Sequence, residues 1–330
     1  MARSKILYRF TVGLPLKLNE STFAPYRSQE DATLIKLEDF YDTEGTNSYI
    51  FTDHQVKFTI RMSDKPSPNI GHVTLYNLDP DLMKYLQGNS GNHLVCILEA
   101  GDNEQGLKQL YKGTISNVKI SDDDVDNYAK MTITDGGLNV KSAFTVRGYP
   151  KNTPYKQIIQ DLAGDMKLPV GILSGVSGST VSAVSLMGKT HSILEDHLLQ
   201  QGIDYSIQNS VINILPQYQR KASEVSIIRN DTGLIGKIVP VVQDSTSTNT
   251  TQSTDSEQVA FKCLLDGALS PTETVYLQDG DFDGAYKLTS VTFHGDFEGN
   301  LWICECLAKP TEGVLDSDTR DLSTLQIPLI

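Results

Sequence analysis

The sequence predicts a mainly β protein that carries a small α+β module between two β-rich regions. Short apolar segments with strand-like alternation recur from residue 55 to 137 and again from 219 to 309, and turn residues separate them. Residues 148–218 differ, because two helical patterns and a hairpin follow one another there. Several short strands with one small helix are typical of a β-barrel or β-sandwich, which we expect in the β-rich regions.

The first β region is expected to span residues 1–147. Residues 5–18 fit a strand broken at Gly13 and Pro15, whereas residues 19–54 form a long polar excursion without periodicity. The segment QVKFTIRM, at 55–62, alternates cleanly and places its apolar side chains on one face. Further strands are predicted at 71–78, 93–101, 110–120 and 127–137. A short helix is expected between them, with Asp79 as its N-cap, Pro80 in its first turn and Gly88 at its end.

The middle module is expected to span residues 148–218. Its first helix would begin with Thr153 as cap and Pro154 in the first turn, and it would end near Met166. Ser192 and Glu195 form a capping-box pattern that predicts a second helix, closed at residue 202. Residues 204–216 predict a β-hairpin with its turn at residues 209 and 210.

The second β region is expected at 219–309, and a tail follows at 310–330. Six apolar segments predict strands here, and a loop rich in Ser and Thr at 244–258 interrupts them. The tail is polar until it ends in LQIPLI. We expect this apolar end to dock on the chain itself or on a partner, through Leu325, Ile327, Leu329 and Ile330.

Composition argues against several classes of function. The chain has 28 basic and 41 acidic residues, a net charge of −13, and no basic run of five or more. We therefore do not expect nucleic-acid binding to be its main function. It has no apolar run of 18 residues, which predicts no membrane anchor. The four cysteines show no metal-ligand spacing, so we expect reduced, packed thiols in a reducing cytoplasm.

The sharpest catalytic candidate is the sequence His294-Gly-Asp296, close to Cys304 and Cys306. A His–Asp pair can orient an imidazole as a general base, but no Gly-x-Ser-x-Gly motif supplies a nucleophile. Residues 279–284, DGDFDG, resemble a calcium loop in composition, as does the acidic run 122–124, yet the downstream Glu of an EF-hand is missing. We therefore assign no catalytic, cofactor-binding or metal-binding residue, and we interpret HGDFEGN as a turn between two strands.

Several stretches, in this order, resemble the tail baseplate hub proteins of contractile-tailed phages, the T4-type hub or late-control-D-like family. They are GHVTLYNLDPDLMKYLQGN, LVCILEAG with LYKGTISNVKI and MTITDGG, YPKNTPYKQIIQDLAGDM, LLDGALSPTETVYL, and YKLTSVTFHGDFEGNLWICECLA. The resemblance covers most of residues 55–309. Residues 19–54 and 244–258 have no counterpart in the family, so their roles stay open.

The resemblance implies a structural hub without enzymatic activity or cofactor. Proteins of this type form homotrimers in which two similar β-barrels per subunit make a pseudo-sixfold ring. One face of the ring meets the hexameric tail tube or a tube-initiator protein, the other holds the trimeric central spike, and wedge proteins surround it. The chain would then belong to the virion tail baseplate, assembled in the host cytoplasm.

In such a ring DNA is only passing cargo. The acidic composition suggests the hypothesis of an acidic lumen, through which DNA slides without binding. Two alternatives stay open from the residues alone. One is a β-rich cell-wall hydrolase that uses His294 or the acids at 279–284. The other is a receptor- or carbohydrate-binding module of a tail.

Overall fold

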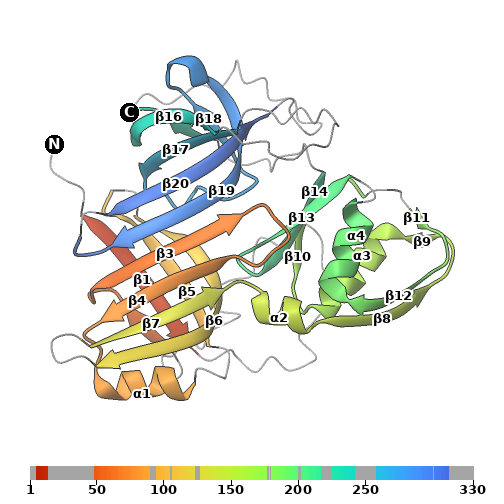
Figure 1. The fold of residues 1–330 in the computed structure, drawn as a ribbon, viewed down its shortest axis with the longest axis horizontal. Coiled ribbons are helices and arrows are strands. Elements are labelled where there is room, and N and C mark those ends of the chain that lie inside the picture. Colours follow the sequence, from red (N-terminus) through yellow and green to blue (C-terminus); the bar gives the residue numbers. More distant parts are fainter. Residues whose placement is uncertain are drawn as a thin grey trace, which may run out of the picture.

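The computed structural model describes residues 5–13, 48–89, 94–104, 106–122, 127–176, 178, 180–199, 202–216, 225–241, 258–299 and 301–311. The chain is mainly β with a small α+β insert, as predicted (Figure 1). The insert projects to one side of a large twisted sheet, and the strands of both β regions belong to that one sheet. The tail residues predicted to dock, Leu325 to Ile330, lie outside the described residues.

The first β region contains seven strands and one helix. They are β1 (Ile6–Gly13), β2 (Ser48–Phe51), β3 (Val56–Ser63), β4 (Ile70–Tyr76), α1 (Pro80–Gly88), β5 (Val95–Asp102), β6 (Gly106–Asp122) and β7 (Asn127–Thr134). Helix α1 begins as predicted, because the Asp79 carboxylate accepts hydrogen bonds from the amides of Asp81 and Leu82, both at 2.9 Å.

Strand β2 corrects one expectation. The excursion predicted at 19–54 includes this short strand, which pairs with β1 so that Phe51 lies opposite Phe10. Both phenylalanines are buried, and their rings lie 6.2 Å apart. An isolated four-residue strand with polar neighbours has too little alternation to be found from local pattern. Residues 14–47 lie outside the described part of the chain.

The insert contains three helices and seven short strands. They are α2 (Gly137–Ser142), β8 (Phe144–Tyr149), β9 (Thr153–Pro154), α3 (Tyr155–Asp165), β10 (Val170–Leu173), β11 (Thr180–Val181), β12 (Val184–Lys189), α4 (Thr190–Leu199), β13 (Ile203–Gln208) and β14 (Val211–Pro216). The predicted hairpin turn is confirmed, because Asn209 and Ser210 both have positive φ, 54° and 64°. A separate hydrophobic core, which includes Leu162, Leu194 and Ile214, fills the insert.

Both helix starts in the insert differ from prediction. Pro154 is the residue that precedes α3 and offers no capping side chain, and the Thr153 hydroxyl donates to the Pro150 carbonyl at 2.7 Å instead. Helix α4 begins at Thr190, two residues before the predicted cap Ser192. The buried Thr190 hydroxyl lies 2.8 Å from that of Thr145 on β8, so a tertiary contact sets this end.

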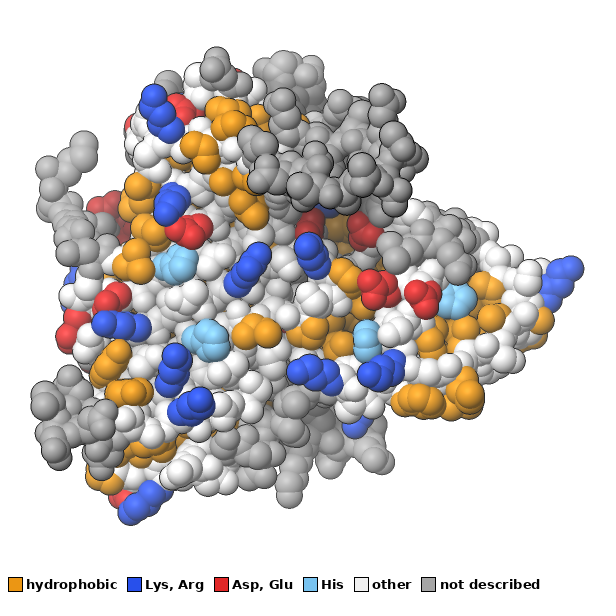
Figure 2. Space-filling view, viewed as in Figure 1, with side chains coloured by type: hydrophobic (Ala, Val, Ile, Leu, Met, Phe, Trp, Pro, Cys, Tyr) orange, Lys and Arg blue, Asp and Glu red, His pale blue; other side chains and the backbone are white. Residues whose placement is uncertain are grey.

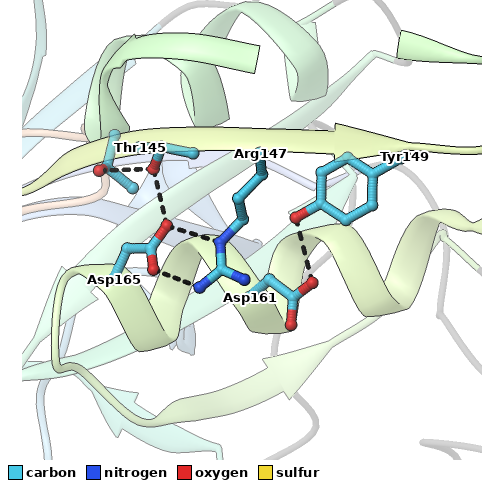
Figure 3. A network of polar contacts seen from close by, with 6 residues as sticks. Thr145, Arg147, Tyr149, Asp161 and Asp165 are labelled. Atoms are coloured by element: carbon cyan, nitrogen blue, oxygen red, sulfur yellow. Dashed lines mark hydrogen bonds and ion pairs between the residues drawn. The ribbon is translucent and has the colours of Figure 1, made fainter. Parts of the chain in front are cut away.

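Polar contacts hold α3 against β8 (Figure 3). The Arg147 guanidinium donates two hydrogen bonds to the Asp165 carboxylate, at 3.0 and 2.5 Å, and the Thr145 hydroxyl donates a third at 2.9 Å. One turn earlier on α3, Asp161 accepts from the Tyr149 hydroxyl at 3.1 Å. The Arg147 guanidinium lowers the pKa of Asp165 below its usual range.

The second β region contains β15 (Ser226–Ile228), β16 (Leu234–Val241), β17 (Gln258–Leu264), β18 (Thr274–Leu277), β19 (Gly284–Asp296) and β20 (Trp302–Pro310), with one 3₁₀ turn at Gly280–Phe282. Residues 242–257, most of the predicted Ser/Thr loop, lie outside the described residues. The main hydrophobic core is shared by both β regions, from Val56 and Phe58 on β3 to Phe293 on β19 and Cys306 on β20. The two regions are therefore joined by one sheet and one core.

A buried polar cluster attaches the insert to the first β region. The Asp135 carboxylate accepts hydrogen bonds from the amide and the side chain of Asn69, at 2.7 and 3.0 Å, and from the amide of Asn209 at 3.0 Å. The Asn69 side chain also donates to the Ile207 carbonyl at 2.8 Å and accepts from the Ser63 amide at 2.8 Å. Burial raises the pKa of Asp135 to about 7.

Candidate assembly interface

The sequence candidates for catalysis do not form a recognisable active site. His294 and Asp296 lie within β19 rather than in a turn, which begins only after Asp296. The two imidazole nitrogens of His294 lie 3.4 Å from the Thr59 hydroxyl and 3.5 Å from the Glu305 carboxylate. Asp296 faces Lys57 instead, at 3.3 Å. The pair that looked catalytic in sequence is therefore two separate cross-strand contacts.

The cysteines pack in the core. Cys304 and Cys306 share one face of β20, and both are buried beside Cys263 on β17. Burial raises the pKa of the Cys304 thiol well above its usual value, so the thiol stays protonated at neutral pH. Trp302 shares this face and packs edge-on against Phe58, with ring centroids 5.5 Å apart.

The described residues of the acidic loops and helices form no site of another kind. Asp279, at the predicted calcium-like loop, accepts a hydrogen bond from the Ile238 amide at 3.2 Å and shapes a strand corner. The side chains of the acidic run 122–124 lie outside the described residues. Across the described segments, no three His, Cys, Asp or Glu residues are grouped to hold a metal ion. No helix in those segments is both long and apolar enough to cross a membrane.

The same strand order occurs twice in the sheet, although the last pair differs in direction, since β1 pairs antiparallel with β5 and β15 pairs parallel with β18. In the first β region the strands lie in the order β3-β4-β7-β6-β5-β1, and in the second they lie in the order β16-β17-β20-β19-β18-β15. Strands at the same place in the two orders also come at the same place in the chain order of their region. Thus β3 corresponds to β16, β4 to β17, β7 to β20 and β6 to β19. The resemblance implied two similar units, and the repeat lies in the pairing order of the strands rather than in a shared sequence motif.

A shared irregularity supports the repeat. The pairing of β6 with β7 shifts register at Ser116, and the pairing of β19 with β20 shifts at Thr289. The Ser116 hydroxyl donates to the Thr132 carbonyl at 3.1 Å, and the Thr289 hydroxyl donates to the Leu307 carbonyl at 3.2 Å. Aligning the two bulges makes Ser121 on β6 the counterpart of His294 on β19.

One antiparallel junction joins the two repeats. Strand β19 pairs with β3 from Ser290 opposite Ser63 to Asp296 opposite Lys57. The Ser290 hydroxyl donates to the Met62 carbonyl at 3.0 Å, and Gly295 lies opposite Phe58, where an added Cβ would come within 2.2 Å of the ring. The junction is thus a specific, close-packed contact between β19 of the second repeat and β3 of the first.

The corresponding edges of β6 and β16 pair with no other strand among the described residues. Strand β5 pairs with β6 only from Gly106 to Thr114, so the far half of β6 has a strand on one side only among the described residues. At the other end, β16 pairs only with β17 within the described part of the chain. Ile235 and Val239 on β16 are 38% and 52% exposed. These edges are the counterparts of β19 and β3 at the internal junction, and such edges favour pairing with another chain.

The fold is similar to that of known tail proteins. A 43 kDa tail protein of prophage MuSo2 from Shewanella oneidensis matches with a TM-score of 0.57 at 11% identity, over 79% of this chain and 95% of that one. A tail protein from Neisseria meningitidis MC58 matches with 0.58 at 9%, over 92% and 96%. A type VI secretion component from E. coli, described as similar to the T4 tail proteins gp27 and gp5, matches with 0.54 at 12%, over 78% and 74%.

No family model matches the sequence, and no curated protein matches it significantly. The likeness to solved structures therefore concerns the fold, at identities of 9–12%. It agrees with the fold expected from the sequence resemblance. The chain has the fold of phage tail and related type VI secretion proteins.

Proposed function

We propose that this chain is the structural hub of a phage-type tail baseplate, a homotrimer that forms a pseudo-sixfold ring. The observation that supports this most directly is the repeat, together with two strand edges, on β6 and β16, that pair with no other described strand. Three copies of a chain with two repeats provide six units, and a junction between β6 of one copy and β16 of the next would repeat the internal β19–β3 junction. Each edge would then be satisfied by an equivalent partner.

The dimensions of such a ring suit a channel. Each copy would contribute eight strands, β16-β17-β20-β19-β3-β4-β7-β6. With strands about 4.8 Å apart, 24 strands give a circumference of roughly 115 Å and a diameter of at least about 37 Å, and tilt widens it further. Side chains on the inner face narrow the bore by roughly 10 Å, which leaves room for a DNA duplex.

This architecture suits an adaptor between assemblies of different symmetry. One face of the ring would meet a hexameric tail tube or tube-initiator protein through its six similar units, and the other would hold a trimeric central spike. Wedge proteins would contact the outside. We also propose that Leu325, Ile327, Leu329 and Ile330 dock the C-terminal tail on one of these partners. Removing residues 312–330 is expected to leave the trimer intact and to weaken partner capture.

Engineered disulfides test the ring. Within one chain, His294 lies opposite Thr59, and their counterparts by the repeat are Ser121 and Val239. The variant Ser121→Cys/Val239→Cys is therefore expected to cross-link between copies under mild oxidation and to give dimers and trimers on a non-reducing gel. Thr59→Cys/His294→Cys is the matched control, and it should cross-link within one chain.

A register-shifted pair makes the test stringent. Lys119→Cys/Val239→Cys moves one cysteine two residues along β6, to a diagonal separation of about 7–8 Å, so it should cross-link much less. Failure of the in-register pair in a protein that remains monomeric would refute the ring. A cell-wall-degrading activity that disappears in His294→Ala would favour the hydrolase alternative.

A further inference from the structure

The eight-stranded part of the sheet has one buried and one exposed face. Alternate residues such as Ile60, Met131 and Phe293 face the shared core, and their neighbours face outward. Outward residues line up in rows across the strands. One row reads His294, Thr59, His72, Thr132 and Asn117 in successive register pairs. Figure 2 views this exposed face, where basic side chains and two histidines are spread over the strands.

The exposed face is basic although the chain is acidic. Counting the described side chains of the eight strands away from the insert, it carries six cations and two carboxylates, a balance of +4, against −13 for the chain. The cations are Lys57, Arg61, Lys119, Lys130, Lys237 and Lys262, and the carboxylates are Asp296 and Glu305. Three lysines beside the insert are left out of this balance. The Lys112 amide donates to the Asn209 side chain, Lys287 interacts with Asp64 and Asp204, and Lys309 interacts with Asp64. This charge is opposite in sign to that of the acidic lumen expected from the composition.

Four of these cations lack a neutralising partner among the described residues. Lys57 pairs with Asp296 at 3.3 Å, and Lys262 pairs with Glu305 at 2.7 Å. Arg61, Lys119, Lys130 and Lys237 have no carboxylate at ion-pair distance in the described segments.

Two of the four are placed against each other. Lys119 and Lys130 lie directly opposite in the β6–β7 register, an arrangement that costs free energy unless an anion screens it. Such a pair on a face without countercharge favours an anionic partner.

We propose that this basic face contacts the phosphate backbone of duplex DNA without reading its sequence. Charge complementarity selects the partner, because spaced single cations interact with a regular line of phosphates. Thr, Asn and His side chains between the cations supply further hydrogen-bond donors for phosphate oxygens. Among the described residues, tyrosines on this face are confined to one pair at an end of β4 and β7, Tyr76 and Tyr128, whose ring centroids lie 5.8 Å apart. The rest of the face presents small polar side chains rather than a line of large aromatic rings for unpaired bases, which favours a duplex over a single strand.

If the proposed ring is correct, this face lines its channel. The opposite face carries the core, helix α1 and the strands β5, β1, β18 and β15, a further layer about 10 Å away. That layer would fill the bore if it pointed inward, so the exposed face must point toward the axis. The location of the DNA contact inside a channel rests on the proposed function. The contact itself does not, because the basic face is present on each single chain.

Fluorescence anisotropy with a labelled duplex of random sequence tests the contact, over about 50–200 mM salt. The variant Arg61→Glu/Lys130→Glu reverses two central cations that lie away from the proposed junction. It should weaken binding at least tenfold and make the log–log salt dependence less steep by about 2 per bound copy. Lys84→Glu/Lys151→Glu makes the same change in net charge on exposed lysines outside the sheet, and binding should change less than twofold.

Each other outcome decides against the proposal. If both variants weaken DNA binding equally, binding depends on the net charge of the chain rather than on this face. If the protein shows no salt-dependent binding to the duplex, the proposed DNA contact does not exist. If polyglutamate displaces DNA more strongly than unlabelled DNA does at equal charge, the face serves an acidic protein segment instead.

Light scattering on the same samples separates the two proposals. Loss of DNA binding by an intact trimer overturns only the DNA contact. A monomer whose binding depends on Arg61 and Lys130 overturns only the ring.

Discussion

Asn69 is the side chain whose loss should most directly uncouple the insert from the sheet. It is 3% exposed, and its amide group makes four contacts of 2.8–3.1 Å, with Ser63, Asp135, Ile207 and Gln208. The side-chain amide has two donor hydrogens and its oxygen accepts one, so about three hydrogen bonds are fully formed. At about 1 kcal/mol for each neutral bond and about 2 kcal/mol for the one to the carboxylate, Asn69→Ala should destabilise the protein by roughly 4 kcal/mol.

The effect should depend on pH, because Asp135 titrates. Burial raises the pKa of Asp135 to about 7, so the carboxylate is charged at pH 8 and protonated at pH 5. The lost bond is stronger to the charged form, so the destabilisation should be larger at pH 8. Urea unfolding at both pH values measures it, and hydrogen exchange should show β13 and β14 losing protection before β3 and β4.

The exposed Asn117 provides the matched control, because Asn117→Ala removes the same group from the surface and should change stability by less than about 0.5 kcal/mol. A destabilisation below about 1 kcal/mol for Asn69→Ala, or equal loss of protection in both β regions, would refute the role given to the cluster.

Three further changes test the fold. The pKa of Asp135 in the folded protein lies above its ordinary value, so the contribution of this group to stability is present below about pH 4 and is lost as pH rises through about 7. Asp135→Asn should therefore remove up to about 4 kcal/mol of this pH dependence from the free energy of unfolding, measured by urea titrations. Asp165 has the opposite sign, since Arg147 lowers its pKa: Arg147→Ala should cost about 1 kcal/mol at pH 7, after allowance for solvent screening, and nothing once acid has protonated Asp165, as followed by thermal unfolding across pH. Phe293→Ala empties a fully buried position next to the internal junction and should cost about 3–5 kcal/mol in urea; a value near 1 would contradict close packing there.

Much of the fold follows from local pattern, and its functional surfaces do not. Alternation identifies β3 from Val56 to Met62, and the Asp79 cap identifies α1, because both signals are carried by neighbouring residues. Helix α4 begins earlier than its capping box because a buried Thr190–Thr145 contact decides its start. The turn assigned around His294 is strand because β3 pairs with that segment across 235 residues.

The assembly edges escape sequence analysis for the same reason. The β19–β3 junction depends on pairing between distant segments, and the repeat survives in strand order and in the bulges at Ser116 and Thr289 rather than in a shared motif. The basic face cannot be recognised from the sequence, whose net charge is −13. It forms only when the fold brings alternate residues of eight strands to one side of the sheet. Alternation alone gives each strand's outward residues, but not which strands lie side by side.

Electron cryomicroscopy of the purified full-length chain tests the central claim most directly. The account predicts a threefold-symmetric ring of three 36.3 kDa chains, in which β6 of each copy pairs antiparallel with β16 of the next and Ser121 lies opposite Val239. A monomer, or an oligomer joined through the insert while β6 and β16 stay unpaired, would contradict it.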